Sequence, residues 1–547
     1  MTRADRDTRE APRSAVLDSA HLGDIEGAFG KISIADHDQP RSLKARLATL
    51  AAIVGPGIIV MVGDNDAGGV ATYAQAGQNY GYSLLWVLLL LIPVLIVNQE
   101  MVVRLGAVTG VGHARLINER FGRGWGWFSV GDLFLLNFLT LVTEFIGITL
   151  AADYIGISKY VVVPVAAVAL VAIMATGSFR RWERAMFVFI AVTLVQIPML
   201  LMSHPNWGQA AKSFVVPSIS GGISSDAVLL IIAIVGTTVA PWQLFFQQSN
   251  VVDKRITPRF MAYERADTVL GAFIVVIGAA ALLMTGDWAA RSTDTIGKFV
   301  DAGEIARLLG QNSGHLGALF AIALMDASII GAAAVTLATS YAFGDVFGLK
   351  HSLHRGFGDA KQFYLSYSAM VALAAVIVLI PGAPLGLITT AVQALAGLLL
   401  PSASVFLLLL CNDPEVLGPW VNRTWLNWVA GLIVGVLLLL SGILMATTLF
   451  PDLNVVKVAG YLAAGLVVLA AAAAVVLRWM SRREPATAAP VPHRELDRDS
   501  WRMPPLALLE PVKWSAGTRL GMIALRGYLV IGALLLIVKA IQLGKGG

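Results

Sequence analysis

Two carboxylates stand one residue apart in an otherwise apolar stretch near the start of the chain. Asp64 and Asp66 flank Asn65 within the glycine-rich run 63–69. A carboxylate inside a membrane is costly unless it is paired or hydrated, so both are candidates for a functional site. Oxygen ligands of this kind suit hard divalent cations such as Mg²⁺, Ca²⁺ or Mn²⁺. The other interpretation is that these residues cap a helix, because Asp, Asn and Gly favour such positions.

Three more polar side chains lie inside apolar runs further along the chain. Glu144 could attract cations or relay a proton, or it could form a polar contact between helices. Asp326 could line an ion path or hydrogen-bond to a neighbouring hydroxyl. Gln393 could face a cavity or make an ordinary helix contact. Near the end of another run, we expect Arg104 and Glu100 to form a structural ion pair.

Composition indicates the environment of these residues. Only 14% of the 547 residues are charged and 57% are apolar, whereas about 25% of a soluble globular chain is charged. So few charges cannot cover a water-exposed surface, which excludes a soluble enzyme and predicts a polytopic membrane protein. The basic residues form no cluster with aromatic side chains. We therefore expect the lipid bilayer as a partner, not nucleic acid, and we expect no obligatory protein partner.

The sequence gives no sign of a resident cofactor or of enzyme chemistry. Cys411 is the single cysteine, which excludes an intramolecular disulfide and a thiolate metal cluster. All eight histidines lie in tails or polar connections, so no serine in an apolar run has a histidine as its general base. No phosphate-binding loop and no His-Glu-x-x-His pattern occurs. We expect no enzyme and no cofactor, with an intramembrane enzyme as the alternative.

Apolar runs of roughly 17–25 residues, the length that crosses a bilayer, predict twelve spans and a thirteenth candidate. The predicted regions are a cytoplasmic tail (1–44), a ten-span core (45–411), spans 11 and 12 (412–480), a polar linker (481–515) and a C-terminal region (516–547). Residues 520–543 form the thirteenth candidate. The twelve runs are 47–80, 82–103, 126–154, 159–176, 185–202, 227–249, 267–286, 316–343, 365–381, 388–411, 427–450 and 457–480.

Basic residues in the short loops predict the orientation of the chain. Loops that include Arg120, Arg181, Lys254 and Arg355 are rich in Lys and Arg, and the intervening loops contain few. Cytoplasmic loops carry the excess of Lys and Arg. We therefore expect a multi-pass protein of the plasma (inner) membrane with a cytoplasmic N-terminus.

Two of the twelve spans contain residues that disfavour a continuous helix. The first contains residues 55–57 (Gly-Pro-Gly) and the run 63–69, and the sixth contains 236–241, where Pro241 cannot donate to the helix ladder. Such backbone is tolerated in a membrane where it lines a cavity or is buried in protein. Because the two spans are five apart, they predict an inverted repeat of five plus five helices with a site between the broken ones.

Several stretches together resemble the Nramp-type divalent metal transporter family. They are residues 55–90, 104–110, 143–147 and 236–241, Gln393 placed eight residues before Pro401, and residues 412–422. The resemblance covers roughly residues 45–450, and the motifs are specific in combination. It implies the LeuT-like fold: an all-α polytopic membrane protein with a 5+5 inverted repeat, broken helices 1 and 6, and two or three additional C-terminal spans.

This chain departs from the family pattern at two ligand positions. The resemblance implies that Asp66 keeps the acidic ligand of the first broken helix, whereas Gly69 replaces an Asn ligand and Ala240 replaces a Met ligand. A thioether is a soft ligand that favours transition metals over Mg²⁺ and Ca²⁺. Both replacements enlarge the site and leave oxygen as its ligand atom. Mg²⁺ retains several waters and is held by one or two carboxylates, so the change favours a partly hydrated ion.

The chain also departs from the family at positions associated with protons. Trp242 and Gln247 replace two histidines of the sixth span, and Leu141 replaces an aspartate three residues before Glu144. Loss of these groups removes the expected proton relay. The whole pattern resembles the Nramp-related magnesium transporter branch. The expected metal site comprises Asp66, Asp64, Asn65, Gly69, the Thr237 carbonyl and Ala240, and the expected cavity or ion path comprises Trp242, Gln393, Glu144 and Asp326.

The sequence therefore predicts a transporter that imports Mg²⁺, and also Mn²⁺, by alternating access without coupled protons. One alternative is a proton-coupled Mn²⁺ and Fe²⁺ transporter of the same family, although this chain lacks the thioether and histidines of that family. A second is an amino-acid or organic-cation symporter of the LeuT-like fold. A third is a membrane receptor or scaffold that does not transport, because homologous folds need not share function.

Overall fold

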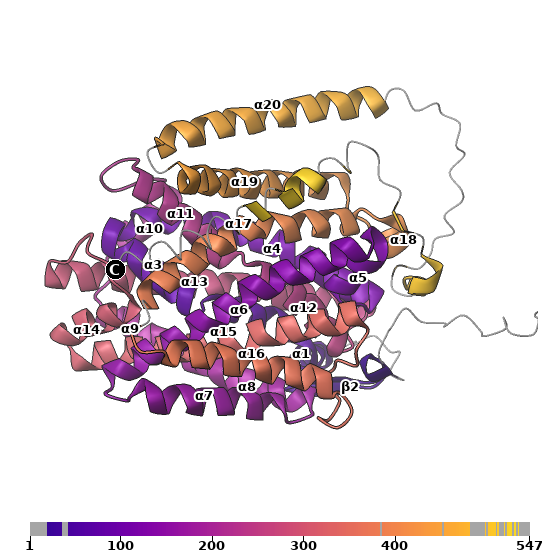
Figure 1. The fold of residues 1–547 in the computed structure, drawn as a ribbon, viewed down its shortest axis with the longest axis horizontal. Helices are drawn as coiled ribbons and strands as arrows, with labels where there is room; N and C mark the ends of the chain where they lie inside the picture. The colour runs from indigo at the N-terminus through magenta and orange to yellow at the C-terminus, as the bar shows by residue number, and fades with distance from the viewer. Residues whose placement is uncertain are drawn as a thin grey trace, which may run out of the picture.

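The computed structural model describes residues 19–34, 42–382, 385–450, 453–481 and parts of 498–534. In this part of the chain two short strands accompany a large helical bundle (Figure 1). Helices occupy all twelve apolar runs. Among the described residues, eight helices are long and apolar enough to cross a membrane, or up to ten if each of two bent pairs is one span. The thirteenth candidate, residues 520–543, lies largely outside the described residues.

The first span is divided into three helices by two interruptions. α1 (Leu43–Ile53) and α2 (Pro56–Asp64) meet at an angle of 51°. Gly55 lies between them with φ +156°, a conformation open to glycine, and Pro56 begins α2, where its missing N–H costs nothing. The second interruption falls at Asn65 and Asp66, after which α3 (Ala67–Tyr80) begins. Both interruptions agree with the predicted breaks.

The sixth span is divided once, at the predicted place. α11 (Ser225–Thr238) ends where Val239 leaves the helical conformation, and Ala240 is extended with φ −88° and ψ 145°. Pro241 then begins α12 (Pro241–Asp253). The broken spans lie against each other, because α12 packs on α2 and α11 packs on α3.

Long helices enclose the two broken spans. α15 (Gly314–Phe347) packs against α6 (Arg123–Tyr154) and α12, while α13 (Met261–Thr293) packs against α2, α3 and α4 (Leu85–Thr109). α19 (Thr424–Leu449) and α20 (Val455–Ser481) lie along one edge of the bundle (Figure 1). The remaining helices with more than one turn are α5 (His113–Phe121), α7 (Lys159–Met174), α8 (Phe179–Val192), α9 (Gln196–Met202), α10 (Trp207–Val215), α14 (Ala302–Asn312), α16 (Lys361–Leu379) and α17 (Leu385–Cys411). This is the predicted all-α, LeuT-like architecture.

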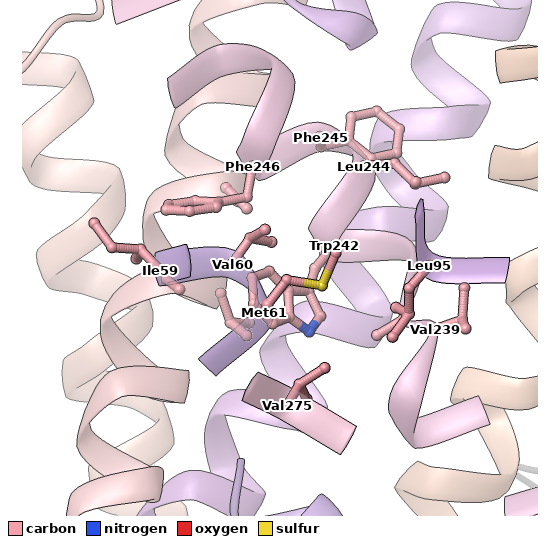
Figure 2. Close-up of a cluster of buried hydrophobic side chains, with 14 of the residues drawn as sticks. Ile59, Val60, Met61, Leu95, Val239, Trp242, Leu244, Phe245, Phe246 and Val275 are labelled. Carbon is pink, nitrogen blue, oxygen red and sulfur yellow. The ribbon is translucent and has the colours of Figure 1, made fainter. Parts of the chain in front are cut away.

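Burial distinguishes helices inside the bundle from those at its surface. Every residue of α2 is buried, and Figure 2 shows Ile59, Val60 and Met61 of this helix beside Trp242 and Phe246 of α12. α7 is equally apolar, yet only Val163, Leu170 and Met174 of its residues are buried. A helix that is apolar on all sides must be covered by protein or by lipid. α2 is covered by protein, and the lipid phase would cover the outer face of α7.

The N-terminal segment forms structure that the sequence did not predict. Residues 1–44 were expected to be a tail, but β1 (Ile25–Gly27) and β2 (Gly30–Ile32) pair as an antiparallel hairpin. The hairpin lies near α1 at one end of the bundle (Figure 1). Ala28, in its turn, donates from its backbone N–H to Glu183 of α8, and its carbonyl accepts from Arg184.

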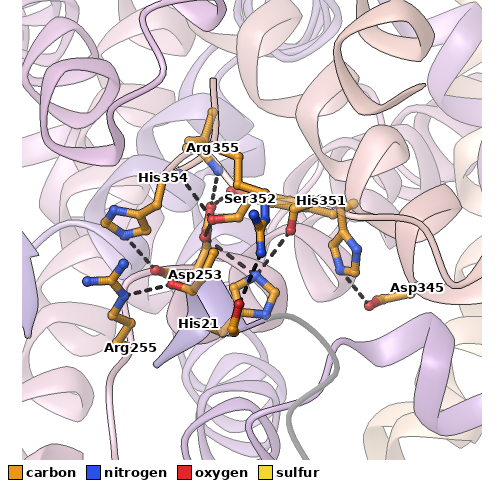
Figure 3. A network of polar contacts seen from close by, with 12 residues as sticks. His21, Asp253, Arg255, Asp345, His351, Ser352, His354 and Arg355 are labelled. Carbon is orange, nitrogen blue, oxygen red and sulfur yellow. Dashed lines mark hydrogen bonds and ion pairs between the residues drawn. The ribbon is translucent and has the colours of Figure 1, made fainter. Parts of the chain in front are cut away.

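A polar network surrounds the hairpin at this end, which we call the basic end after Lys254, Arg255 and Arg355. Arg255 donates to the carbonyls of Ala20 and Asp24. Figure 3 shows His21, Asp253, Ser352 and His354, which come from three segments of the chain, meeting here. Residues far apart in sequence are thereby joined at the basic end.

Candidate metal-binding site

Asp64 and Asn65 lie at the C-terminal end of α2, deep inside the bundle. The Asp64 side chain accepts a hydrogen bond through Oδ1 from the Gln243 amide of α12, and its Oδ2 has no partner among the described residues. The Asn65 amide donates to the Val275 carbonyl of α13 at 3.1 Å, which leaves its Oδ1 unpartnered in the same part of the chain. Each residue therefore presents one buried oxygen that the protein itself does not satisfy.

Asp66 caps the helix that follows. Its Oδ1 accepts from the Gly69 backbone N–H at 2.8 Å, so the capping role that was weighed as the alternative is present in the structure. Capping and cation binding are compatible, since a carboxylate has two oxygens and about four lone-pair sites. The positive end of α3 also favours an ionised carboxylate at this position.

Glu144 reaches the same break from α6. Its Oε2 accepts from the Ala67 backbone N–H at 3.1 Å, while its Oε1 has no partner within the described ranges. The Asp66 and Glu144 side chains both lie over Gly331 of α15, where a Cβ would stand 2.9 Å from each of them. The small residue in α15 thus permits two carboxylates to approach one another.

The second break adds oxygens from α11. The Thr237 hydroxyl is buried, and among the described residues it has no hydrogen-bond partner. A Cβ on Gly69 would lie 3.0 Å from the Asp64 carbonyl and 3.5 Å from the Thr237 hydroxyl. The Tyr73 and Thr238 hydroxyls are 2.7 Å apart and join α3 to α11. The predicted residues of the two broken spans therefore meet around Gly69.

Ala240 and Trp242 provide an apolar boundary. Ala240 is buried at the start of α12, and its methyl group occupies little of the space at the break. The Trp242 ring lies against Gly63 of α2 and packs edge-on against Phe246. Gln247 donates to the Thr268 hydroxyl at 3.0 Å, so this amide is engaged away from the break.

For the remaining predicted residues, no contact with the helix breaks is found among the described side chains. Asp326 is buried in α15, and neither of its oxygens has a partner in the described part of the chain, so the alternative role, a hydrogen bond to a neighbouring hydroxyl, is absent there. Gln393 is in α17, but its side chain lies outside the described residues. Glu100 and Arg104 form the predicted ion pair at 3.1 Å, and Arg104 also donates to the Asn422 side chain.

Gln243 is a contact residue that the sequence analysis missed. It lies two residues after Pro241, binds Asp64 through its amide and accepts from Gln99 of α4 at 3.3 Å. A signal for it was available, because it is a polar residue directly after a helix break in an apolar span. It holds the Asp64 carboxylate in place from the opposite broken helix.

The donor set is poor in the side chains that usually hold metals. Within the described residues, no group of three or more His, Cys, Asp or Glu is arranged to hold a metal ion. The site instead combines two carboxylates with amide, hydroxyl and main-chain oxygens. The C-terminal ends of α2 and α11 carry free carbonyls and partial negative charge, which attract cations at such breaks.

This fold and site define a polytopic membrane protein of LeuT-like architecture, with a buried, oxygen-rich centre between two broken helices. The family model described as "Natural resistance-associated macrophage protein-like", or Nramp, matches residues 57–447. The chain belongs to this family.

Curated relatives and a solved structure are similar over most of the chain. A "Divalent metal cation transporter MntH" of Lacticaseibacillus casei is 26% identical over 426 residues, which cover 73% of this chain and 90% of that protein. The protein of the same name from Bacillus subtilis is 26% identical over 474 residues, covering 81% and 98%. The crystal structure of an Eremococcus coleocola manganese transporter matches with a TM-score of 0.62 at 21% identity, covering 80% of this chain and 96% of that one. This structural match supports the fold.

Proposed function

We propose that this protein is a divalent metal cation transporter that imports Mg²⁺, and also Mn²⁺, by alternating access. Membership of the Nramp family and the names of the curated relatives support divalent metal transport. The choice of Mg²⁺ depends on the chemistry of the helix breaks. Asp64, Asn65 and Asp66 would meet the ion, together with the Thr237 carbonyl and the space left by Gly69 and Ala240.

The observation that carries this proposal is the set of buried oxygens at the breaks. The unpartnered atoms include Asp64 Oδ2, Asn65 Oδ1 and Thr237 Oγ1. Buried polar groups are normally hydrogen-bonded, and such exceptions indicate a ligand or ordered water. All three atoms are oxygens, which suits hard cations. Mg²⁺ dehydrates reluctantly, so waters that it retains can hydrogen-bond to oxygens that it does not touch directly.

Transport without coupled protons is the second part of the proposal. Leu141 is fully buried and apolar where the family resemblance places an aspartate, and Gln247 is engaged by Thr268 where it places a histidine. A neutral amide and an alkyl group cannot relay protons at physiological pH. The membrane potential alone supplies about 4.6 kcal/mol per 100 mV for a divalent ion, twice the value for a single charge.

The direction of import follows from the proposed orientation. The basic end contains Lys254, Arg255 and Arg355, and an excess of Lys and Arg marks the cytoplasmic side. We place the N-terminal hairpin in the cytoplasm and the protein in the plasma (inner) membrane. An ion that enters from the opposite side would reach the helix breaks before the basic end.

Uptake into proteoliposomes tests both parts. Mg²⁺ and Mn²⁺ are offered in competition, with an interior pH dye and a potassium gradient to set the potential. We expect Mg²⁺ uptake that increases with an inside-negative potential, competition between the two ions at similar concentrations, and no change in the dye signal. Uptake of Mn²⁺ alone, accompanied by acidification, would contradict the Mg²⁺ proposal and favour the proton-coupled alternative.

One observation favours that alternative. Glu144 is retained at the first break, where its Oε1 lacks a partner among the described residues. A buried carboxylate next to Asp66 can carry a proton. Glu144→Gln separates the two functions. If transport is uncoupled, the variant should still take up the ion and the pH dye should still show no change. If transport is proton-coupled, the variant should lose the acidification that accompanies uptake.

A further inference from the structure

A small polar cavity lies beside the break in the sixth span. It is lined by Ser129 and Asp132 of α6, Pro241 and Phe245 of α12, and Ser402 of α17, with leucine and alanine side chains completing its wall. Its size leaves room for about one water molecule in the conformation described. None of its polar side chains belongs to the metal site predicted from the sequence.

The oxygens in this cavity are not satisfied by the protein. Among the described residues, Asp132, Ser129 and Ser402 make no hydrogen bond or ion pair with another group, and both serines are buried. Asp132 lies inside the apolar helix α6. A carboxylate at such a place is costly unless water or a cation accompanies it. Three oxygen-bearing side chains around one small cavity therefore form a site for a hard cation or for the waters of its hydration shell.

The cavity lies between the helix breaks and the basic end. Pro241 is the first residue of α12, adjacent to Ala240 at the break, and α12 continues to Asp253 at the basic end. On α6, Asp132 is twelve residues before Glu144, which corresponds to about 18 Å along the helix axis towards its start at Arg123. Glu144 reaches the first break, so Asp132 and Glu144 mark successive depths in the bundle.

We infer that Ser129, Asp132 and Ser402 form a second, transient position for the transported divalent cation, occupied after the ion leaves Asp64 and Asp66 on its way to the basic end. The inference rests on the proposed function. A carboxylate at this depth lowers the energy of a doubly charged ion that would otherwise cross apolar surroundings. The two hydroxyls replace water molecules that the ion sheds in the narrow passage.

The second position binds the ion weakly, which favours its release. One carboxylate and two neutral hydroxyls offer less negative charge than Asp64 and Asp66 together, so the ion is held more weakly here than at the breaks. The cavity is also too small for a fully hydrated ion, so the contact between α6, α12 and α17 must widen when the ion passes. Release towards the basic end is thus the step that Asp132 serves.

Asp132→Asn in the full-length protein tests this inference. We expect the maximal rate of Mg²⁺ uptake into proteoliposomes to fall by about tenfold, equivalent to about 1.4 kcal/mol in the barrier. The external Mg²⁺ concentration for half-maximal uptake and equilibrium Mg²⁺ binding by calorimetry should change less than about twofold, because Asp64 and Asp66 are intact. Asp132→Glu should restore most of the rate, since it keeps the charge.

A matched control makes the same chemical change on the same helix. Asp153 lies at the other end of α6, exposed and paired with Arg307 at 2.9 Å, so Asp153→Asn should transport at the wild-type rate. Thermal unfolding in detergent checks the fold, and Asp132→Asn should not lower the melting temperature, because it removes an unpaired carboxylate.

Three results would overturn the inference: a wild-type uptake rate for Asp132→Asn, a loss of equilibrium binding as large as that of Asp66→Asn, or a rate loss explained by a lower melting temperature. The wild-type protein reports separately on the proposed function. If it takes up Mn²⁺ but not Mg²⁺, the same comparison is made with Mn²⁺ and decides the role of Asp132. If the wild-type protein transports neither ion, both proposals fail.

Discussion

Two buried polar regions of this molecule use similar residues and arrange them in opposite ways. At the basic end, Asp253 accepts hydrogen bonds from the Tyr341 and Ser352 hydroxyls and from the Leu353 N–H. Lys254 donates to Glu183 at 2.6 Å and to two carbonyls, of Ile53 and Val54, at 2.7 and 2.9 Å. At the helix breaks, by contrast, Asp64, Asn65 and Thr237 each keep a buried oxygen without a partner among the described residues.

We interpret this difference as one between structural polar groups and the groups proposed to bind the ion. A carboxylate whose oxygens are all engaged has no capacity left for an ion, and its removal leaves its partners unsatisfied. A carboxylate with a free oxygen in a buried place retains that capacity and destabilises the resting protein. Burial and charge alone would place Asp253 and Asp64 in the same class. The two residues differ in hydrogen bonding, because both Asp253 oxygens have partners and Asp64 Oδ2 has none among the described residues.

The largest effect is expected from breaking the ion pair between Lys254 and Glu183 at the basic end. Lys254→Met leaves Glu183 buried without its cation, so we expect a loss of about 3–5 kcal/mol in stability. The double variant Lys254→Met/Glu183→Gln should recover much of this, since it removes both charges. Thermal and denaturant unfolding in detergent measure both variants. Equal stability of the single variant and the wild type would show that the region is not a structural clamp.

The second effect concerns the unsaturated region. Asp66→Asn keeps an N-cap side chain for α3, because Asn caps helices as well as Asp does, but removes the charge. We expect Mg²⁺ affinity to fall by about 100-fold, or about 2.7 kcal/mol, with little change in melting temperature. Calorimetric titration and uptake measure the loss. If the variant has a lower melting temperature but still binds Mg²⁺ as the wild type does, Asp66 has a structural role and is not a ligand.

The third effect is a change in ion preference. Ala240→Met introduces a thioether at the start of α12, and soft ligands favour transition metals over Mg²⁺. We expect the ratio of Mn²⁺ to Mg²⁺ uptake to rise by about tenfold, equivalent to about 1.4 kcal/mol. Ala240→Leu serves as the control, because it fills similar space without sulfur. If both variants change the ratio equally, volume and not ligand chemistry sets the preference.

The smallest effect is a pH dependence at the basic end. Burial disfavours the charged form of His351, but Asp345, at 3.1 Å from Nε2, outweighs it and raises the pKa of His351 above 6.5. A raised pKa in the folded state contributes stability below pH 6.5 that is lost as pH rises through the folded value. His351→Gln should therefore lose up to about 1 kcal/mol relative to the wild type at pH 6 and less at pH 8.

A neighbouring histidine opposes this trend, so the comparison must be made between variants. Burial lowers the pKa of His354, and Arg255 acts in the same direction, so its contribution to stability is lost as pH falls. Melting temperatures of the wild type and His351→Gln at both pH values isolate the His351 contribution. A pH-independent difference between the two proteins would contradict the assignment.

The fold and the position of the breaks could be predicted because local chemistry determines them. Gly55 and Pro56, and later Pro241, cannot continue a helix, and the structure breaks there. Apolar run length likewise located the helices. Asp132 carried the same signal as Glu144, an acidic residue inside an apolar run, but only the cavity around it identifies it as a candidate.

The partners of these residues could not be predicted from the sequence, because they come from distant segments. Gln243 lies 179 residues from Asp64, and Lys254 lies 71 residues from Glu183. Nothing in the local pattern of either residue specifies its partner. The distinction between saturated and unsaturated carboxylates depends on such contacts, so it required the three-dimensional structure.

The N-terminal hairpin has a consequence for the order in which the protein is made. His21 hydrogen-bonds to the His351 carbonyl, 330 residues later. Chains are synthesised at about 5–20 residues per second, so His21, just before the hairpin, waits roughly 15–65 s after its own synthesis before that partner exists. Glu183 likewise lacks Lys254 for about 4–14 s, because 71 residues separate the two in the chain. The N-terminal segment can therefore complete its contacts only after most of the bundle has been made.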